Sequence, residues 1–347
     1  MAAIAVIGGG IVGCLVARQI VEQQPGSTVT LLDRDAVGCG ASRRSAGLHF
    51  PRGATDRVRR MSEFSEAFYR ELAGLPIYPI GMSVLTRADD DQIERTYCHR
   101  THRDESTTVN AGGTSIPVAP DVSMWDVDGA QHADVARLVA ALAADLRPRA
   151  DVREGVGVTG LEPYDRGVRI ELGTGDQLTV DRVVLAPGPW LYAPAWAKWV
   201  APLGARVKKI VSIHIERPVR PDDRAIVLHD EDAFLLPLAY RGHWLFSYTC
   251  PDWDVDPDLV GSGLNSRDVQ RARECLGRYA PELVAAAASG RVFCDAYSID
   301  ATPVARALDT DRRLVFAGAA NGSGYRLAPA IAAEALRAFE PSGKGIF

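Results

Sequence analysis

The sequence lacks the paired cysteines that mark disulfide frameworks and most structural zinc sites. Six cysteines are scattered over the 347 residues, and no two of them form a Cys-x-x-Cys pair. The one cluster with metal-ligand character, Cys98-His99-x-x-His102, is not followed by a second ligand pair. We therefore predict reduced thiols in a cytoplasmic protein, with no disulfide framework and no metal site.

Long apolar runs and an excess of basic residues are also absent. No uninterrupted apolar stretch reaches membrane-spanning length, and the apolar N-terminus has no basic region and is broken by three glycines. The formal net charge of −5 gives no general attraction for nucleic acid or anionic membranes. We expect neither a membrane nor a nucleic acid as a partner, and nothing in the sequence sets the oligomeric state.

What the sequence does contain is a nucleotide-binding pattern at its start. An apolar, β-branched run over residues 4–7 leads into Gly8-x-Gly10-x-x-Gly13, and apolar side chains at helical spacing follow. Gly8 allows the tight turn, Gly10 lets the backbone approach phosphates, and Gly13 lets the helix pack closely on the strand. The order strand, glycine turn, helix predicts an anionic group at the N-terminus of that helix.

The next strand supplies the context that makes the glycine pattern specific. Residues 29–32 form an apolar run that ends in Asp33, twenty residues after Gly13. A carboxylate at this distance can accept hydrogen bonds from a ribose. The pattern therefore predicts a bound dinucleotide. The glycine-rich, basic loop that follows, residues 34–47, is too long for a simple strand-to-helix connection.

The rest of the chain alternates between helical and strand-rich stretches. Helical spacing predicts helices over residues 58–68, 135–146, 268–279 and 329–339, and short β-rich runs occupy most of residues 76–126 and 199–297. We predict an α/β fold with an α+β inserted part, that is, a Rossmann-like nucleotide domain with an inserted antiparallel β-sheet domain for the substrate. The predicted boundaries are residues 1–75, 127–198 and 298–347 for the discontinuous nucleotide domain, and residues 76–126 and 199–297 for the inserted domain.

Four separated segments carry a resemblance to a known family, in the right order and over nearly the whole chain. They are Gly8-x-Gly10-x-x-Gly13 with Asp33; Gly40-Ala41-Ser42-x-x-Ser45-Ala46-Gly47; Leu185-Ala186-Pro187-Gly188-Pro189-Trp190; and Phe316-Ala317-Gly318 through Gly322-Ser323-Gly324-Tyr325-Arg326-Leu327-Ala328-Pro329. With these segments the chain resembles the FAD-dependent D-amino acid oxidase, glycine oxidase and sarcosine oxidase superfamily, and it is closest in type to glycine oxidase and monomeric sarcosine oxidase. The last segment is the most specific of the four.

The resemblance implies a two-domain flavoprotein that oxidises an amine by hydride transfer from its α-carbon to flavin N5. The imine is then hydrolysed, and O₂ is the expected electron acceptor, with H₂O₂ as product. The expected substrate is glycine or an N-carboxymethyl or N-alkyl glycine, which would give glyoxylate and the freed amine. In such an enzyme the flavin performs the chemistry, and the protein supplies orientation, a carboxylate anchor and exclusion of water.

The same resemblance assigns residues to the FAD. The glycine turn and Asp33 would hold the pyrophosphate and ribose, Arg34 the adenine side, the basic loop the phosphates, and the closing glycine turn the flavin ring. The full set is Gly8, Gly10, Ile11, Val12, Gly13, Asp33, Arg34, Ser42, Arg43, Arg44, Ser45, Ala46, Val158, Ala186, Gly188, Trp190, Gly318, Gly322, Ser323, Gly324, Tyr325, Arg326 and Leu327. The alternatives are a solvated arginine at Arg34, an exposed basic loop over residues 42–46, and a core-filling Trp190.

For the substrate, Arg326 is the first candidate. Sarcosine-oxidase-like relatives hold the substrate carboxylate with a lysine at the corresponding place, and a guanidinium can grip a carboxylate through two parallel hydrogen bonds. The alternative for Arg326 is a structural arginine paired with a core acid. Tyr297, Phe234, His49 and Tyr248 are the other expected pocket residues, and Arg52 follows the same loop as His49.

Three departures from the family pattern restrict these expectations. The carboxylate-binding Gly-Leu-Arg-Pro segment of glycine oxidases is replaced by residues 295–298, which read Asp-Ala-Tyr-Ser. The strand over residues 243–246 lacks the lysine that activates oxygen in sarcosine oxidases. Cys294 stands three residues before Tyr297 rather than two, so we expect FAD to be bound non-covalently.

Several other functions fit parts of the pattern. They are a dehydrogenase that passes electrons to an acceptor other than oxygen, a D-amino acid oxidase, and an RNA-modifying flavoprotein. A regulatory protein that binds a nucleotide without turnover is the alternative from another class. The net charge and the absence of a basic arm disfavour RNA as a partner. A flavin spectrum in the purified protein separates the enzymes from the regulatory protein.

Overall fold

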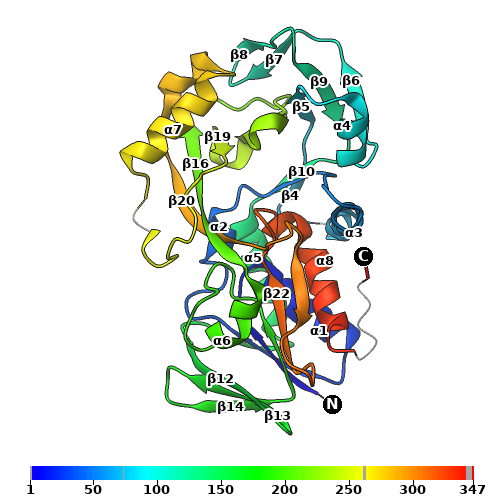
Figure 1. The fold of residues 1–347 in the computed structure, drawn as a ribbon, viewed down its shortest axis with the longest axis vertical. Coiled ribbons are helices and arrows are strands. Elements are labelled where there is room, and N and C mark those ends of the chain that lie inside the picture. The colour runs from blue at the N-terminus through cyan, green and yellow to red at the C-terminus, as the bar shows by residue number, and fades with distance from the viewer. Residues whose placement is uncertain (1, 73, 261–262, 341–345) are drawn as a thin grey trace.

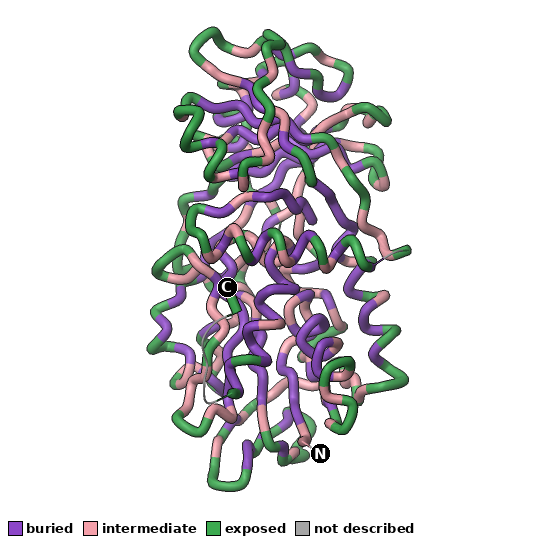
Figure 2. Tube along the Cα trace, turned by 90° about the vertical axis from the view of Figure 1, so that its right-hand side faces the viewer, coloured by how far each residue is buried: buried purple, intermediate pink, exposed green. Residues whose placement is uncertain are grey.

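The molecule is elongated, with a sheet-and-helix body at each end of its long axis (Figure 1). The computed structural model describes residues 2–72, 74–260, 263–340 and 346–347. Both termini lie in the body that contains the N-terminal strand, and buried residues run through the interior of both bodies (Figure 2). Each body therefore has a core of its own.

The body at the termini is built on a six-stranded sheet. Its strand order is β11 (Asp151–Arg153), β2 (Thr28–Leu32), β1 (Ala3–Ile7), β15 (Arg182–Leu185), β22 (Leu314–Gly318) and β21 (Val304–Ala307). The strands run parallel except β21, which pairs antiparallel with β22. Such a parallel sheet has to be covered on both faces, because its strands carry apolar side chains on each.

Side chains along β1 alternate between the two faces of this sheet, and each face packs against a separate core. Ile4 and Val6 face a core made with the helices α1 (Ile11–Gln23), α3 (Asp56–Glu71), α5 (Val135–Leu146) and α8 (Gly324–Arg337). Ala5 and Ile7 face the opposite core. That side is covered by the antiparallel strands β12 (Val158–Tyr164), β13 (Gly167–Leu172) and β14 (Gln177–Val180) and by α6 (Ala197–Val200).

The other body is built on an eight-stranded sheet. Its order is β20 (Ala287–Tyr297), β16 (Arg206–Ile215), β19 (His243–Tyr248), β18 (Ala233–Leu238), β17 (Ala225–Leu228), β5 (Met82–Thr86), β9 (Ser123–Val127) and β6 (Thr101–Asp104). All neighbours are antiparallel except β5 and β17, which run parallel. The helix α7 (Ser266–Gly277) and the ribbon of β7 (Thr108–Ala111) and β8 (Thr114–Pro117) cover one face.

Short elements complete the chain. A three-stranded sheet of β3 (Leu48–His49), β10 (Gln131–Ala133) and β4 (Ile77–Pro79) lies between the two bodies (Figure 1). The remaining helices are α2 (Ala41–Arg44), α4 (Asp90–Thr96), and the single-turn or 3₁₀ helices η1 (Ala201–Leu203), η2 (His229–Glu231), η3 (Ala239–Arg241) and η5 (Pro281–Ala286). Across the described ranges, no helix has both the length and the apolar character needed to cross a membrane.

The predicted fold class is confirmed: a Rossmann-like α/β body carries a β-sheet body inserted between its strands. The inserted sheet, predicted to be antiparallel, contains a parallel pair, β5 with β17. The exact domain boundaries stay a prediction.

The closing helix begins earlier than its sequence suggested. The prediction of a helix over residues 329–339 places Pro329 in its first turn, whereas α8 runs Gly324–Arg337 with Pro329 inside it. Proline has no N–H, so the carbonyl of Tyr325, four residues earlier, receives no helical hydrogen bond. The hydroxyl of Tyr69 donates to that carbonyl at 2.5 Å. A tertiary contact thus compensates for the proline.

Candidate active site

A single cavity of about 510 Å³ runs between the two bodies and collects the four motif segments. It is lined by the first glycine turn, the loop after Asp33, the turn after β15, the closing glycine turn, and parts of β16, β18, β19 and β20. Its volume is that of a small-molecule or cofactor site. Predicted site residues in its wall are Gly8, Gly10, Ile11, Val12, Asp33, Arg34, Ser42, Arg44, Ser45, Ala46, Val158, Ala186, Gly188, Trp190, Phe234, Tyr248, Tyr297, Gly318, Gly322, Ser323, Gly324, Tyr325 and Arg326.

The first glycine turn is shaped by close backbone contacts. Gly8 has a φ of +103°, and a Cβ added there would lie 2.2 Å from the carbonyl oxygen of Ala186. At Gly13 a Cβ would lie 1.8 Å from the carbonyl oxygen of Gly8, because α1 rests directly on the turn. Gly13 therefore packs the helix against the turn and does not line the cavity.

The amides at the start of α1 have side-chain partners. Asp33 accepts a hydrogen bond from the N–H of Gly9 at 2.7 Å, and Ser42 accepts one from the N–H of Ile11 at 2.9 Å. Burial raises the pKa of Asp33 above its usual range. These contacts fix the turn, the second strand and the basic loop in one arrangement around the helix N-terminus.

Arg34 and Trp190 form a cluster with Asp258 at the edge of the cavity. The guanidinium of Arg34 lies 4.4 Å above the Trp190 ring and pairs with Asp258. The indole N–H of Trp190 donates to the same carboxylate at 2.8 Å. Trp190 is thus more than core filling, and Arg34 is held in place although half of its side chain is exposed.

The two arginines of the basic loop, Arg43 and Arg44, point in different directions: one lines the cavity and the other is exposed to solvent. Arg44 lines the cavity, bonds to the Cys39 carbonyl at 3.4 Å, and has no carboxylate within 4.0 Å among the residues that the structure describes. Arg43, next to it, is exposed and does not line the cavity. Arg44 is thus the cation of this loop that is free to meet a phosphate.

These features fit FAD. Glycines at points of close backbone approach, a helix N-terminus, and an arginine without an acidic partner form the donor set that a pyrophosphate needs. The Tyr325 hydroxyl, buried without a partner in the described chain, lies in the same wall. The cavity is continuous from Val158 to Arg326, so one elongated molecule can reach both glycine turns.

Arg326 lies in the first turn of α8, at the other end of the cavity. Its Nη1 donates to the carbonyl of Arg52, and its Nη2 donates to the hydroxyl of Ser323 at 2.7 Å. The guanidinium lies 5.2 Å from the centre of the Phe50 ring. Burial and the nearby charge of Arg52 lower the pKa of Arg326 to about 10, which still leaves it charged at neutral pH.

The alternative of an arginine paired with a core acid finds no support in this geometry. No carboxylate oxygen of the described residues lies within 4.0 Å of Arg326, whereas Arg57 of the same body pairs with the buried Glu334 of α8. A buried guanidinium bound only to neutral oxygens can still accept an anion.

Arg52 has an acidic partner that sequence reasoning missed. Its Nη1 lies 3.1 Å from Asp232 Oδ1, and Thr249 donates to Asp232 Oδ2 at 3.0 Å. The charge of Arg52 and the bond from Thr249 hold the pKa of Asp232 below its usual range. Asp232 has a φ of +46°, a left-handed conformation that an aspartate adopts at some cost.

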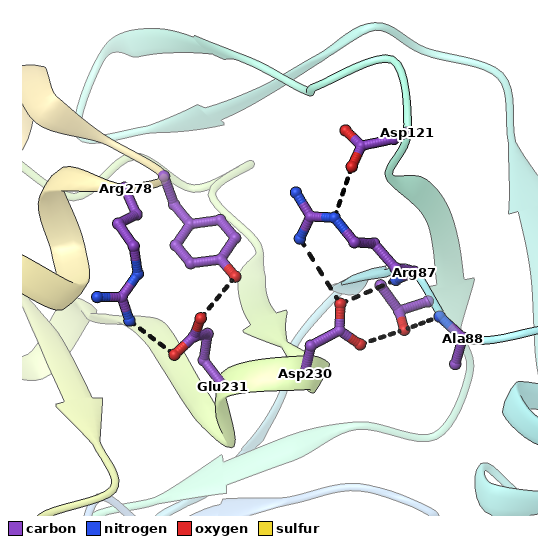
Figure 3. A network of polar contacts seen from close by, with 8 residues as sticks. Arg87, Ala88, Asp121, Asp230, Glu231 and Arg278 are labelled. Carbon is purple, nitrogen blue, oxygen red and sulfur yellow. Dashed lines mark hydrogen bonds and ion pairs between the residues drawn. The ribbon is translucent and has the colours of Figure 1, made fainter.

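Polar contacts fix the short helix η2, which precedes Asp232, to the segments on either side of it (Figure 3). Asp230 accepts hydrogen bonds from Thr86 Oγ1 at 2.8 Å and from the N–H of Arg87 at 2.9 Å. Glu231 pairs with Arg278 of the segment after α7 at 2.7 Å. These contacts hold the turn that carries Asp232 to the cavity.

Tyr297, Phe234 and Tyr248 come from β20, β18 and β19, and all three line the cavity. The Tyr297 hydroxyl lies 3.0 Å from the position of a Cβ at Gly322, which explains the small residue in the closing turn. The hydroxyl of Tyr248 is directed to the carbonyl of Asp268 at 3.4 Å. Tyr248 therefore presents its ring rather than a free hydroxyl.

His49 does not line the cavity, contrary to expectation. Leu48 and Phe50 do, and strand alternation turns the residue between them to the opposite side. The imidazole is fully buried, with its ring centre 6.0 Å from that of Tyr69 and neither nitrogen bonded within the described chain. Burial and the charge of Arg326 lower the pKa of His49 to about 3, so the ring is neutral. Leu327 is likewise buried outside the cavity, since it faces the helical core.

Two further charged groups in the wall were absent from the sequence-based set. Lys208 lies on the same face of β16 as Ile210 and Ser212, and all three line the cavity. Asp295 lines it from β20, two residues before Tyr297. Cys294 also contributes to the wall, and burial together with Asp295 raises the pKa of its thiol to about 11.

Solved structures of known proteins share this fold. NikD, described as an unusual amino acid oxidase essential for nikkomycin biosynthesis, is 16% identical, with a TM-score of 0.78 over 100% of this chain and 96% of NikD. L-proline dehydrogenase from P. horikoshii is 16% identical, with a TM-score of 0.77 over 99% of this chain and 94% of that one. Glycine oxidase from Geobacillus kaustophilus is 16% identical, with a TM-score of 0.72 over 96% and 93%. At these identities the likeness concerns the fold alone.

Family membership rests on a longer pattern. None of the curated proteins matches this sequence. The family model described as "DAO: FAD dependent oxidoreductase" matches residues 3–337, which include all four motif segments. The resemblance stated from those motifs is confirmed, and so are the flavoprotein class and the cofactor: this chain is an FAD-dependent oxidoreductase of the DAO family.

Proposed function

We propose that this protein oxidises the amine of glycine or of an N-substituted glycine. FAD, when bound, supplies the acceptor for the hydride that leaves the substrate α-carbon. The resulting imine takes up water and separates into glyoxylate and the freed amine. With O₂ as the final acceptor, one amine, one O₂ and one water give one amine product, one glyoxylate and one H₂O₂.

The observation that carries this proposal is Arg326. Its guanidinium is partly buried in the wall of the FAD cavity, is charged at neutral pH, and has no acidic partner in the described chain. A planar cation in this setting binds a carboxylate through paired, charge-assisted hydrogen bonds. The bonds to Arg52 and Ser323 fix its orientation before a substrate arrives.

The other cavity residues divide between cofactor and substrate in this proposal. The segments around Gly8, Asp33, Ser42 and Arg44 hold the FAD non-covalently, whereas Phe234, Tyr297 and the ring of Tyr248 enclose the amine. The aromatic wall excludes water from the reacting carbon and limits the size of the amine substituent. The predicted inserted domain, residues 76–126 and 199–297, would then supply most of the substrate side.

The electron acceptor separates this proposal from its nearest alternative. The solved structures of similar fold include both oxidases and an L-proline dehydrogenase, so a non-oxygen acceptor is the second candidate. The H₂O₂ formed per glyoxylate under air decides between the two: a ratio near one supports the oxidase, and a ratio near zero supports the dehydrogenase.

The six free thiols favour a reducing compartment such as the cytoplasm.

The test of the amine proposal is flavin bleaching without oxygen. The purified holoenzyme is mixed anaerobically with glycine, N-alkylglycines and D-amino acids, and flavin absorbance is followed. Bleaching by glycine or N-alkylglycines supports the proposal. Bleaching only by D-amino acids with larger side chains identifies a D-amino acid oxidase instead, and no bleaching by any amine refutes it.

Arg326→Ala tests the carboxylate anchor. Removing one partner of a charged hydrogen-bonded pair in a closed site costs about 2–4 kcal/mol, or about 30- to 700-fold in substrate affinity. Arg337→Ala, at an exposed arginine in the last turn of the same helix, is the control and is expected to bind substrate normally. Unchanged substrate affinity in Arg326→Ala, with FAD still bound, contradicts the assignment.

A further inference from the structure

The cavity wall contains one cation that the proposed function leaves without a role. Among the residues that the structure describes, five arginine and lysine side chains line the cavity: Arg34, Arg44, Arg52, Lys208 and Arg326. Arg34 pairs with Asp258 and Arg52 with Asp232. In the proposal Arg44 faces the cofactor phosphates and Arg326 faces the substrate carboxylate. Lys208 is the remaining cation.

Lys208 is buried, yet it has no anionic partner. It is 7% exposed, and no carboxylate of the described residues lies within 4.0 Å of its ammonium. Two aromatic rings lie close to the ammonium: Nζ is 4.8 Å from the centre of the Trp253 ring and 5.2 Å from that of the Tyr297 ring. Burial lowers the pKa of Lys208, and the charge of Asp232 opposes that effect. Lysines are almost never buried unless they are paired.

Lys209, the next residue on β16, has the acidic partner that Lys208 lacks. Lys209 points to the other side of β16, and its Nζ lies 2.6 Å from the buried carboxylate of Asp268. That pair is closed and lies outside the cavity. Lys208 has no such partner in the described part of the chain, so its ammonium is available to a molecule bound in the cavity.

Lys208 belongs to the same end of the cavity as Arg326. Its Nζ lies 5.2 Å from the centre of the Tyr297 ring. The hydroxyl of Tyr297 lies 3.0 Å from the position of a Cβ at Gly322, in the closing turn four residues before Arg326. Two unpaired cations therefore face the substrate side, whereas a simple N-alkylglycine carries one carboxylate.

We propose that Lys208 binds a second carboxylate, carried on the amine substituent of the substrate. The substrate class is then a secondary amine with two acidic ends: a glycine unit whose carboxylate meets Arg326, and an acidic substituent on nitrogen that meets Lys208. The rings of Trp253 and Tyr297 hold the ammonium in place by cation–π contact. This inference rests on the proposed function, because it assigns the first carboxylate to Arg326.

The experiment compares two ligands of equal chain length on the holoenzyme. N-(2-carboxyethyl)glycine has a terminal carboxylate where N-propylglycine has a methyl group. Their apparent dissociation constants are measured by anaerobic flavin reduction. The wild-type protein is expected to bind the dicarboxylate about 10- to 100-fold more tightly, the range of a charge-assisted hydrogen bond. Equal affinities for the two ligands overturn the proposal without any variant being made.

Variants then assign the preference to the residue. Lys208→Met removes the charge at similar length and is expected to abolish the preference while leaving N-propylglycine binding unchanged; Lys208→Arg is expected to keep it. The control is Lys198→Met, at an exposed lysine whose ammonium lies 5.0 Å from the Trp199 ring, outside the cavity. A preference that survives in Lys208→Met overturns the proposal. Equal weakening of both ligands, or weaker FAD binding, also overturns it, since Lys208 would then serve the flavin.

A separate measurement keeps this test distinct from that of the proposed function. Adipate and hexanoate are the carbon analogues of the two ligands and cannot be oxidised as amines, so their binding is followed by perturbation of the oxidised flavin spectrum. If no amine bleaches the flavin, the proposed function fails. An adipate preference that is lost in Lys208→Met still supports a two-carboxylate site in that case, and the absence of the preference refutes it.

Discussion

The Asp295 side chain is a carboxyl group in the cavity wall with no cation to pair with. Its Oδ1 accepts the N–H of Ala296 at 2.8 Å, and the backbone of Gly322 also donates to it. No lysine, arginine or histidine of the described ranges lies within 4.0 Å of it. Burial raises the pKa of Asp295 to about 6, against these two hydrogen bonds. At neutral pH the folded protein holds this charge at a cost in stability.

We expect the cost of the Asp295 charge to appear in the pH dependence of the free energy of unfolding. Between about pH 4 and pH 6 the folded state retains a proton at Asp295 that the unfolded chain has lost, so this group lowers stability as the pH rises through the window. We expect Asp295→Asn to gain stability relative to the wild type over the same window, by up to about 3 kcal/mol at pH 7. Urea unfolding at a series of pH values measures the difference. Asp311→Asn, at a largely exposed carboxyl, is the control, and a difference for Asp295→Asn that does not change between pH 4 and pH 7 contradicts the prediction.

Single residues of the site were predictable only where a local motif fixes them. Asp33 ends the second strand and was assigned from its spacing to the glycine turn, whereas Arg326 follows the closing glycine turn and was assigned from the family resemblance. Both line the cavity. Asp232, in the turn after η2, and Lys208, on β16, reach the cavity from the other body, and their position depends on packing between distant segments. His49 was misplaced because the alternation of a two-residue strand cannot be assigned a face without its neighbours.

Among the elements, α8 shows where a local rule gives way to a tertiary contact. Proline is favoured in the first turn of a helix, which is why the sequence suggested a start at Pro329. The structure starts the helix five residues earlier, because Tyr69 of α3 satisfies the carbonyl that the proline leaves free. The rings of Tyr69 and Tyr325 stack with centres 4.7 Å apart, which brings the hydroxyl into position. This extension of α8 is what places Arg326 in a helical turn.

We expect Tyr69→Phe to lower the free energy of unfolding, because it removes the hydrogen bond to the Tyr325 carbonyl in α8. The ring packing survives, but a buried carbonyl loses its donor, which costs about 1–3 kcal/mol of unfolding free energy. Tyr279→Phe is the matched control, because its hydroxyl lies 3.3 Å from a partly exposed Glu231, and we expect a change within about 0.5 kcal/mol. Denaturant unfolding of the two variants compares them directly. Equal effects would show that the Tyr69 hydroxyl does not support the helix.

On the scale of the whole molecule, the sequence predicted the nucleotide-binding body more fully than the inserted one. Strand-helix periodicity and the glycine turn predict the local unit β1-α1-β2, whose two strands pair directly. The eight-stranded sheet instead pairs β5 with β17, whose residues Met82 and Ala225 lie far apart in the chain. Such long-range pairing leaves no local signal, so the sequence indicated a β-rich insert without its strand order or its one parallel pair.

The cavity joins the two bodies, and FAD should therefore stabilise the molecule as a whole. A ligand that binds only the folded state at 100 times its dissociation constant adds about 2.7 kcal/mol, which corresponds to roughly 4 °C in Tm for a chain of this length. We expect this shift when FAD is returned to the apoprotein in a thermal scan. Arg44→Ala removes the unpaired cation of the basic loop and should lose at least half of the shift at the same FAD concentration, whereas Arg43→Ala, one residue away and outside the cavity, should keep it. The absence of any shift in the wild type would contradict FAD binding in this cavity. Arg43 and Arg44 carry the same charge and differ only in position, so equal shifts in the two variants would contradict the role of Arg44.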